Sequence, residues 1–196
     1  GRRDDIEAFV RHTVQKGQQV YWVCPLIEES ETLQLQTAVD THVELQAAFP
    51  EYSVGLVHGR LKAADKAAEM QKFIRNEHQV LVATTVIEVG VDVPNASLMV
   101  IEHAERMGLA QLHQLRGRVG RGQAASVCVL MFTEPLSELA KARLKVIYEH
   151  TDGFEIARQD LNIRGPGEFL GAKQSGVPLL RFANLEEDVD LLEQAR

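Results

Sequence analysis

The sequence predicts a doubly wound α/β domain over residues 1–133, followed by a smaller appendage over residues 134–196. Apolar runs of strand length alternate with segments in which apolar residues recur at helical spacing. Several of these strands are apolar on both sides, which is typical of a parallel sheet covered by helices on both faces. After Pro135 the alternation stops, and a segment rich in glycine and proline follows.

The elements follow one another in a regular order. In the first helix, Ile6, Phe9, Val10 and Val14 recur at helical intervals until Gly17. The strands contain runs such as QVYWVCP and QVLVA, which lack the polar alternation of a half-exposed sheet. In chain order we predict helix 4–17, strand 19–25, helix 32–49, strand 53–58, helix 63–75, strand 79–83, strand 97–101, helix 108–118 and strand 127–132.

The appendage has a different pattern. We predict two consecutive helices, 137–150 and 154–160, which are separated at Asp152-Gly153. In residues 164–176, five of thirteen positions are glycine or proline, which indicates a loop. The predicted appendage is therefore a C-terminal helical hairpin with a Gly-rich loop, and residues 186–196 form either an exposed acidic helix or a frayed end.

Charge is distributed unevenly along the 196 residues, whose net charge is −7. Residues 1–105 carry 9 basic and 16 acidic side chains, residues 106–181 carry 11 and 7, and residues 182–196 carry 1 and 5. The three segments thus have net charges of −7, +4 and −4, which sum to −7. The basic middle segment permits a local phosphate-binding surface in an acidic protein.

Several classes of protein are excluded by composition. The sequence contains no apolar stretch that approaches the roughly 20 residues of a membrane span and no signal peptide. Cys24 and Cys128 lie in apolar strands without metal-ligand spacing, so we expect buried free thiols in a reducing cytosol and no metal site. Gly1 is not a natural initiator residue, so we expect the chain to be part of a longer protein.

Polar segments follow three of the strands, where ligands of open α/β sheets bind. His58-Gly59-Arg60 follows the second strand, and the segment from Thr84 to Asp92 follows the third. QLRGRVGR (114–121) ends the helix after the fourth strand and carries three arginines in six residues. Glycines beside the arginines let backbone and guanidinium groups approach an anion closely, which favours phosphate recognition over an ordinary solvated surface.

These segments resemble the motifs of superfamily 2 helicases. QLRGRVGR resembles motif VI, VATTVIEVGVDVPNAS resembles motif V, and VGLVHGR resembles the segment between motifs IV and V. The resemblance implies a RecA-like fold, the second helicase lobe, with ATP bound between two lobes. By position it implies that Arg118 and Arg121 are arginine fingers supported by Gln114, and that Gly90 and Asp92 face the nucleotide. It also implies DNA contacts by Thr84 and by Gly59 with His58 beside it, although capping or core packing by His58 and turn formation by Asp92 stay open.

The appendage resembles the RecG helicases in particular. IARQDLNIRGPGEFLG (156–171) with QSG (174–176) is similar to their translocation motif, and the resemblance extends over essentially the whole chain. It implies that Arg143, Arg164 and Gln174 couple ATP hydrolysis to movement on duplex DNA. The implied partners are branched double-stranded DNA, the N-terminal helicase lobe and wedge domain of the same protein, and single-strand-binding protein. The implied protein is a cytoplasmic, nucleoid-associated bacterial monomer that remodels stalled forks and Holliday junctions.

The chain lacks half of an ATPase site. A P-loop requires a Gly-Lys dipeptide and a Walker B motif an acid pair, and the sequence contains neither Gly-Lys nor Asp-Glu. We therefore expect ATP with Mg²⁺ at the interface with another lobe, and no hydrolysis by this chain alone. Two alternatives stay open: an Mfd-type transcription-repair coupling translocase, which RGPGE and EESE disfavour, and a non-enzymatic nucleic-acid-binding or interaction module.

Overall fold

A computed structural model gives the fold, and it describes residues 2–25, 31–84, 93–119, 126–150 and 154–158. Each element predicted before residue 151 is present, with bounds that differ by at most two residues. One additional element, a short 3₁₀ helix, follows the fourth strand. In chain order the elements are α1 (Arg2–Gln15), β1 (Gln19–Val23), α2 (Glu31–Ala48), β2 (Val54–Val57), α3 (Ala63–Ile74), β3 (Val80–Ala83), β4 (Ala96–Ile101), η1 (Ala104–Arg106), α4 (Leu109–Arg116), β5 (Val127–Phe132), α5 (Glu138–His150) and β6 (Phe154–Arg158).

The strands form one parallel sheet with the order β2-β3-β1-β4-β5-β6. All five residues of the central strand β1 are buried, as expected for a strand that is paired on both sides and covered on both faces. Because every strand runs in the same direction, the sheet has an amino end, where the strands begin, and a carboxyl end, where they finish. The doubly wound parallel sheet predicted from the sequence is confirmed.

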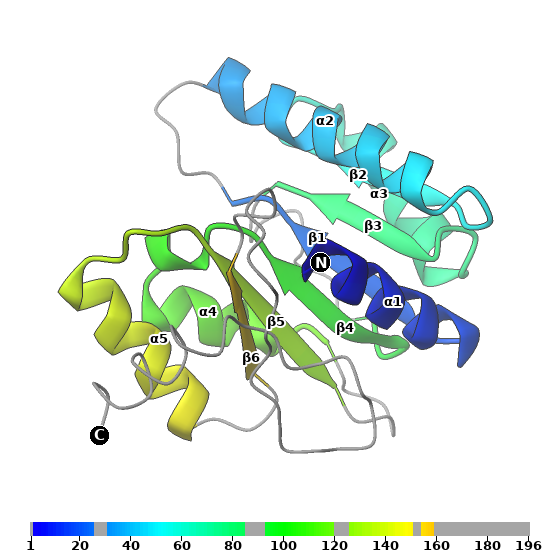
Figure 1. Cartoon of the computed structure of the whole chain (residues 1–196). Coiled ribbons are helices and arrows are strands. Elements are labelled where there is room, and N and C mark those ends of the chain that lie inside the picture. Colours follow the sequence, from blue (N-terminus) through cyan, green and yellow to red (C-terminus); the bar gives the residue numbers. More distant parts are fainter. Residues whose placement is uncertain (1, 26–30, 85–92, 120–125, 151–153, 159–196) are drawn as a thin grey trace.

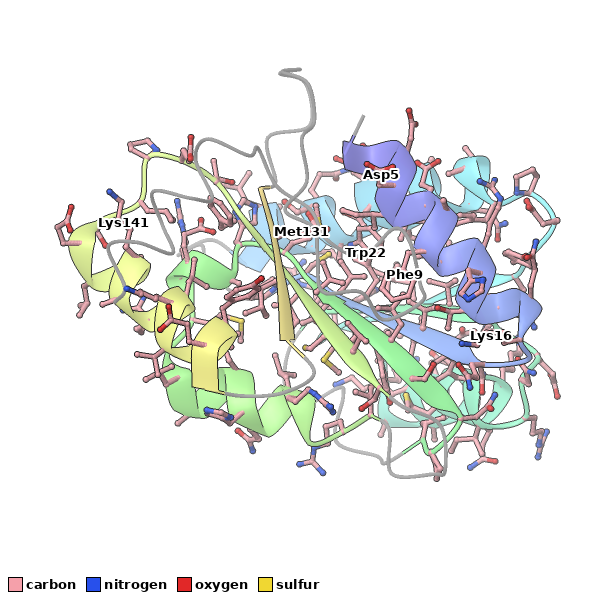
Figure 2. All side chains as sticks on the ribbon, turned by 60° about the horizontal axis from the view of Figure 1, so that its bottom comes forward. Asp5, Phe9, Lys16, Trp22, Met131 and Lys141 are labelled. Carbon is pink, nitrogen blue, oxygen red and sulfur yellow. The ribbon has the colours of Figure 1, made fainter. Side chains whose placement is uncertain are left out.

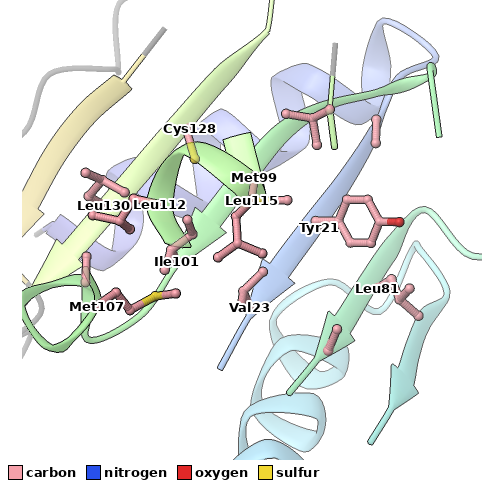
Figure 3. Close-up of a cluster of buried hydrophobic side chains, with 14 of the residues drawn as sticks. Tyr21, Val23, Leu81, Met99, Ile101, Met107, Leu112, Leu115, Cys128 and Leu130 are labelled. Atoms are coloured by element: carbon pink, nitrogen blue, oxygen red, sulfur yellow. The ribbon is translucent and has the colours of Figure 1, made fainter. Parts of the chain in front are cut away.

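Helices cover both faces of the sheet (Figures 1 and 2). Successive strand residues belong to two separate buried clusters, one on each face. On one face, Tyr21, Met99 and Cys128 pack with residues of α3, α4 and α5 in a single buried cluster (Figure 3). On the other face, Trp22 and Met131 share a second cluster with residues of α1 and α2. The two layers of helix explain why the strands carry uninterrupted apolar runs.

The second predicted helix of the appendage is wrong. Residues 154–158 form strand β6, which pairs in parallel with β5 from Cys128↔Phe154 to Phe132↔Arg158. The sheet therefore continues past residue 133, and in the described residues 138–150 and 154–158 helix α5 is followed by a strand instead of a second helix. Phe154 and Ile156 lie on either side of Glu155, a two-residue spacing that fits a short strand as well as a helix. The open side of β5 decides between them. The division of the chain into two domains at residues 133 and 134 stays a prediction.

A polar network closes the amino end of the sheet. The His78 ring lies 2.8 Å from Ser53 Oγ through Nδ1 and 2.8 Å from Glu69 Oε2 through Nε2. The ring lies against buried Gly55 so closely that a Cβ added there would be 2.5 Å from His78 Cδ2. This Ser-His-Glu chain resembles a hydrolase triad. Its members come from the residue before β2, from α3 and from the segment before β3, so the chain as a whole ties these three parts together. We interpret it as structural.

Candidate functional site

Two of the candidate DNA-contacting residues lie side by side at the carboxyl end of the sheet. His58 directly follows β2 and Thr84 directly follows β3, and these strands are paired up to Val57↔Ala83. His58 is half-buried, and its Nδ1 accepts a hydrogen bond from the Arg60 backbone N–H at 3.1 Å. Thr84 is only 3% exposed, so its side chain is not accessible to DNA in this conformation.

Gly59 differs from Gly55 in its surroundings, although only four positions separate them. A Cβ added at Gly59 would meet nothing within 4 Å, and the residue is exposed. Packing therefore does not require a glycine there, whereas close approach of a ligand to the backbone would. Arg60 and Lys62, which are absent from the residues predicted to contact DNA, are exposed beside it. Because both are basic and follow His58-Gly59 closely in the sequence, they could have been added to the predicted DNA contacts.

The arginine segment lies at the opposite end of the sheet. Helix α4 returns from the carboxyl end of β4 toward the start of β5, so its last turn reaches the amino end. The Nη2 atom of Arg116 donates a hydrogen bond to the carbonyl of Ser126, the residue before β5, at 3.3 Å. The length of the strands therefore separates two groups of candidates: those that follow β2 and β3, and those at the end of α4.

Burial anchors the backbone on both sides of Arg118. Leu115 and Val119 are buried in the cluster beneath α3, α4 and α5, while Arg118 between them is half-buried. The Arg118 N–H donates to the Leu115 carbonyl at 2.9 Å, which continues the helical turn beyond the last residue of α4. Gln114 is exposed on the same helix. The tertiary structure thus holds Arg118 at a defined place relative to the sheet.

The candidate coupling residue Arg143 connects α5 to the turn after β4. Its Nη2 atom donates to the Glu105 carbonyl at 2.7 Å. The Glu105 carboxylate in turn accepts a hydrogen bond from the Thr133 backbone N–H at 3.2 Å and lies 3.6 Å from His103 Nδ1. His103 has φ of 52°, a left-handed conformation that is uncommon for residues other than glycine. One short 3₁₀ helix therefore joins the ends of β4 and β5 to α5, a junction that the sequence pattern did not reveal.

The remaining candidates lie outside the described residues. These are the nucleotide-facing Gly90 and Asp92, the second arginine finger Arg121, and the coupling residues Arg164 and Gln174. The chain is described again from Val93, which precedes β4 at the amino end of the sheet, and from Ser126, which precedes β5 there. The roles of all the site residues stay predictions.

The described part of the chain contains no group of three His, Cys, Asp or Glu side chains that could hold a metal ion. Within the same residues, no helix has the length and apolar character needed to cross a membrane. Cys24 and Cys128 are free and buried, as predicted. Burial raises the pKa of the Cys128 thiol to about 12, although the nearby Arg116 charge opposes this shift.

Family models match both parts of the sequence. Residues 3–123 match the helicase conserved C-terminal domain, and residues 150–196 match the C-terminal part of domain 3 of ATP-dependent DNA helicase RecG. The second match covers β6 and the segment that follows it.

Curated relatives extend the similarity over the full chain. The chain is 57% identical to ATP-dependent DNA helicase RecG of Escherichia coli K12 over 100% of its residues, and 50% identical to RecG of Bacillus subtilis 168 over 98%. In each comparison it spans 28% of the relative's length.

Solved structures show the same fold. A structure of RecG bound to a three-way DNA junction is 42% identical, with a TM-score of 0.64 over 98% of this chain and 24% of that one. The C-terminal domain of the DEAD-box protein Dbp5, at 20% identity, has a TM-score of 0.51 over 76% of this chain and 81% of its own, and shares the fold alone.

Proposed function

Because the chain belongs to the helicase conserved C-terminal domain family, in its RecG branch, we propose that it forms the second motor lobe of an ATP-dependent DNA helicase. The complete protein would remodel branched DNA such as stalled forks and Holliday junctions. The observation that carries the proposal is the arginine segment at the end of α4, which is anchored by the core on both sides and carries glycines that let an anion approach.

The amino end of the sheet is the proposed nucleotide side. Arg118 and Arg121 would stabilise charge on the transferring phosphoryl group of ATP, and Gln114 would support the same site. Half-buried Arg118, whose main chain is anchored by its buried neighbours, suits a phosphate contact. This chain would therefore supply the arginine half of the ATP site. Because the sequence contains neither the Gly-Lys of a P-loop nor an Asp-Glu pair, Mg²⁺ and the remaining phosphate contacts would be held by the first lobe. Gly90 and Asp92 would line this cleft.

The carboxyl end is the proposed DNA side. Gly59 can admit a close approach of the DNA backbone, and His58 beside it would hydrogen-bond a phosphate or sugar of the tracking strand. Exposed Arg60 and Lys62 would add charge to the same surface. Thr84 would reach DNA only after a conformational change uncovers it, and such a change accompanies lobe closure in many nucleotide-driven enzymes.

Coupling between the two sides is proposed for Arg143, Arg164 and Gln174. Arg143 holds α5 to the turn after β4, far from the proposed phosphate contacts of Arg118. Its effect would therefore be on movement and not on the chemical step. The proposed partners are branched duplex DNA, the first lobe and wedge domain of the same protein, and single-strand-binding protein. We propose a cytoplasmic, nucleoid-associated monomer.

The test compares this chain with the intact protein from which it derives. ATP hydrolysis is measured with and without a synthetic three-way junction, and junction unwinding is measured in parallel. We expect junction-stimulated hydrolysis and unwinding by the intact protein and no hydrolysis by the chain of 196 residues alone, because it lacks a P-loop. Binding of the junction without any hydrolysis by the intact protein would instead identify a non-enzymatic nucleic-acid-binding module.

A further inference from the structure

The three arginines of the segment 116–121 are not equivalent in the structure. Arg118 follows the end of α4, and Arg121 lies outside the described residues. The side chain of Arg116 turns toward the sheet, and its Nη2 donates to the Ser126 carbonyl at 3.3 Å. One Arg116 nitrogen is therefore occupied by a hydrogen bond to the residue before β5.

The Arg116 guanidinium is partly removed from solvent. Its Nε is buried and has no hydrogen-bond partner among the residues described. Its charge also acts on Cys128, a buried residue of β5, since it lowers the pKa of that thiol against the larger effect of burial. Buried donors without partners are uncommon in folded proteins and call for a reason.

The contacts around Arg116 indicate a structural task for its side chain. Leu115 and Val119 fix the main chain from the core side, and the Val119 N–H donates to the Arg116 carbonyl at 3.4 Å. Neither contact ties the end of α4 to β5 at the surface. The Arg116 side chain supplies that tie, and its anchored main chain is only two residues from Arg118.

We infer that Arg116 is a positioning residue that holds the end of α4 against the start of β5 and thereby fixes Arg118 toward the nucleotide. This inference rests on the proposed function and adds to it a residue outside the nucleotide contacts. A group that acts in the transition state must be held within a fraction of an ångström, so loosening its support lowers the rate more than it lowers binding.

The experiment uses the intact protein and the variants Arg116→Met and Arg116→Lys. Methionine keeps much of the aliphatic length but removes charge and hydrogen bond, whereas lysine keeps the charge and one route to the Ser126 carbonyl. We expect Arg116→Met to lower the kcat of junction-stimulated ATP hydrolysis by roughly 10- to 100-fold with little change in KM for ATP. Arg116→Lys should recover part of the loss. Arg75→Met, the same change at the exposed residue that follows α3, is the matched control and should match the parent protein.

A second measurement separates positioning from direct contact. In an Arg118→Ala background, adding Arg116→Met should cause little further loss, because the supported group is already absent. Hydrogen exchange of the amides of residues 117–119 should speed up in Arg116→Met and stay unchanged in Arg75→Met. Unchanged kcat in Arg116→Met, or full additivity in the double variant, would overturn the inference.

These outcomes are distinct from failure of the proposed function. If Arg118→Ala retains the parent kcat, the arginine finger is wrong, whatever Arg116 does. If Arg118→Ala abolishes turnover while Arg116→Met leaves both kcat and amide exchange unchanged, the proposed function stands and the positioning role falls.

Discussion

The carboxyl and amino ends of the sheet differ in how they hold their candidate residues. At the carboxyl end, Gly59 is open to solvent and exposed basic residues follow it. At the amino end, buried Leu115 and Val119 anchor the main chain around the candidate arginines. Arg116 also donates a hydrogen bond to the Ser126 carbonyl. A surface that slides along a polymer needs accessible backbone and charge, whereas a group that acts on one phosphoryl needs a fixed position. The contrast therefore matches the two proposed tasks of a motor lobe.

The strands of the one sheet separate these two proposed tasks. A change at one end can therefore leave the other intact. The η1 turn joins the carboxyl ends of β4 and β5 to α5, which makes α5 the proposed link between the two sites. The following predictions test this separation, from the largest effect to the smallest.

Removing an arginine finger should stop chemistry and leave DNA binding intact. In the intact protein, Arg118→Ala and Arg121→Ala should each lower kcat by on the order of 10³- to 10⁵-fold. Junction affinity, measured by fluorescence anisotropy without nucleotide, should equal that of the parent protein because the proposed DNA surface lies at the other end of the sheet. Loss of junction binding together with kcat would break the proposed separation of the two ends.

Removing the Arg143 tie should uncouple the two ends. Arg143→Ala loses the hydrogen bond to the Glu105 carbonyl, so substantial ATP hydrolysis should persist while unwinding falls by about tenfold or more. The same result is expected for Arg164→Ala and Gln174→Ala. The quantity to measure is base pairs unwound per ATP hydrolysed. If both rates fall together and the ratio holds, α5 is a structural support and not a coupling element.

Substitution by alanine should lower stability at Gly55 and DNA affinity at Gly59. Gly55→Ala places a Cβ against the His78 ring and should lower the free energy of unfolding by about 1–3 kcal/mol. Gly59→Ala meets open space, so its unfolding free energy should change by less than about 0.5 kcal/mol, while its junction affinity should fall. Thermal or denaturant unfolding, compared with anisotropy titrations, checks both. Equal stability losses would show that Gly59 is held by packing after all.

Charge at the carboxyl end should have the smallest effect. Arg60→Ala and Lys62→Ala should each weaken junction binding several-fold at low salt, with unchanged hydrolysis in the absence of DNA. Removal of one phosphate-binding side chain should reduce the slope of log affinity against log salt by about 0.9 on duplex DNA. Arg75→Ala, at the exposed residue that follows α3, is the control and should leave the slope unchanged. Slopes that do not change for Arg60 or Lys62 would place the DNA path elsewhere.

Apart from the short η1, the order of helices and strands up to α5 was determined by the sequence alone. Apolar runs such as QVYWV and QVLVA carry enough hydrophobic surface to require burial on both faces, so their period and length predict a parallel sheet without tertiary information. The candidate site residues were also named from the sequence, through its resemblance to helicase motifs, and their roles stay predictions. Membership of the RecG family, inferred from residues 156–176, agrees with the family and relative matches.

Tertiary structure decided what depends on partners distant in the sequence. FEIAR became strand β6 because β5 offered a free pairing side, which no local period reveals. Thr84 is buried and Gly59 is open because of the elements around them, although both follow strands in similar sequence patterns. Arg116 is held by Ser126, ten residues away, and the Glu105 junction joins residues up to 38 positions apart. Local sequence patterns nominate the candidate residues, while long-range packing determines which of them are exposed, which are held and which are joined.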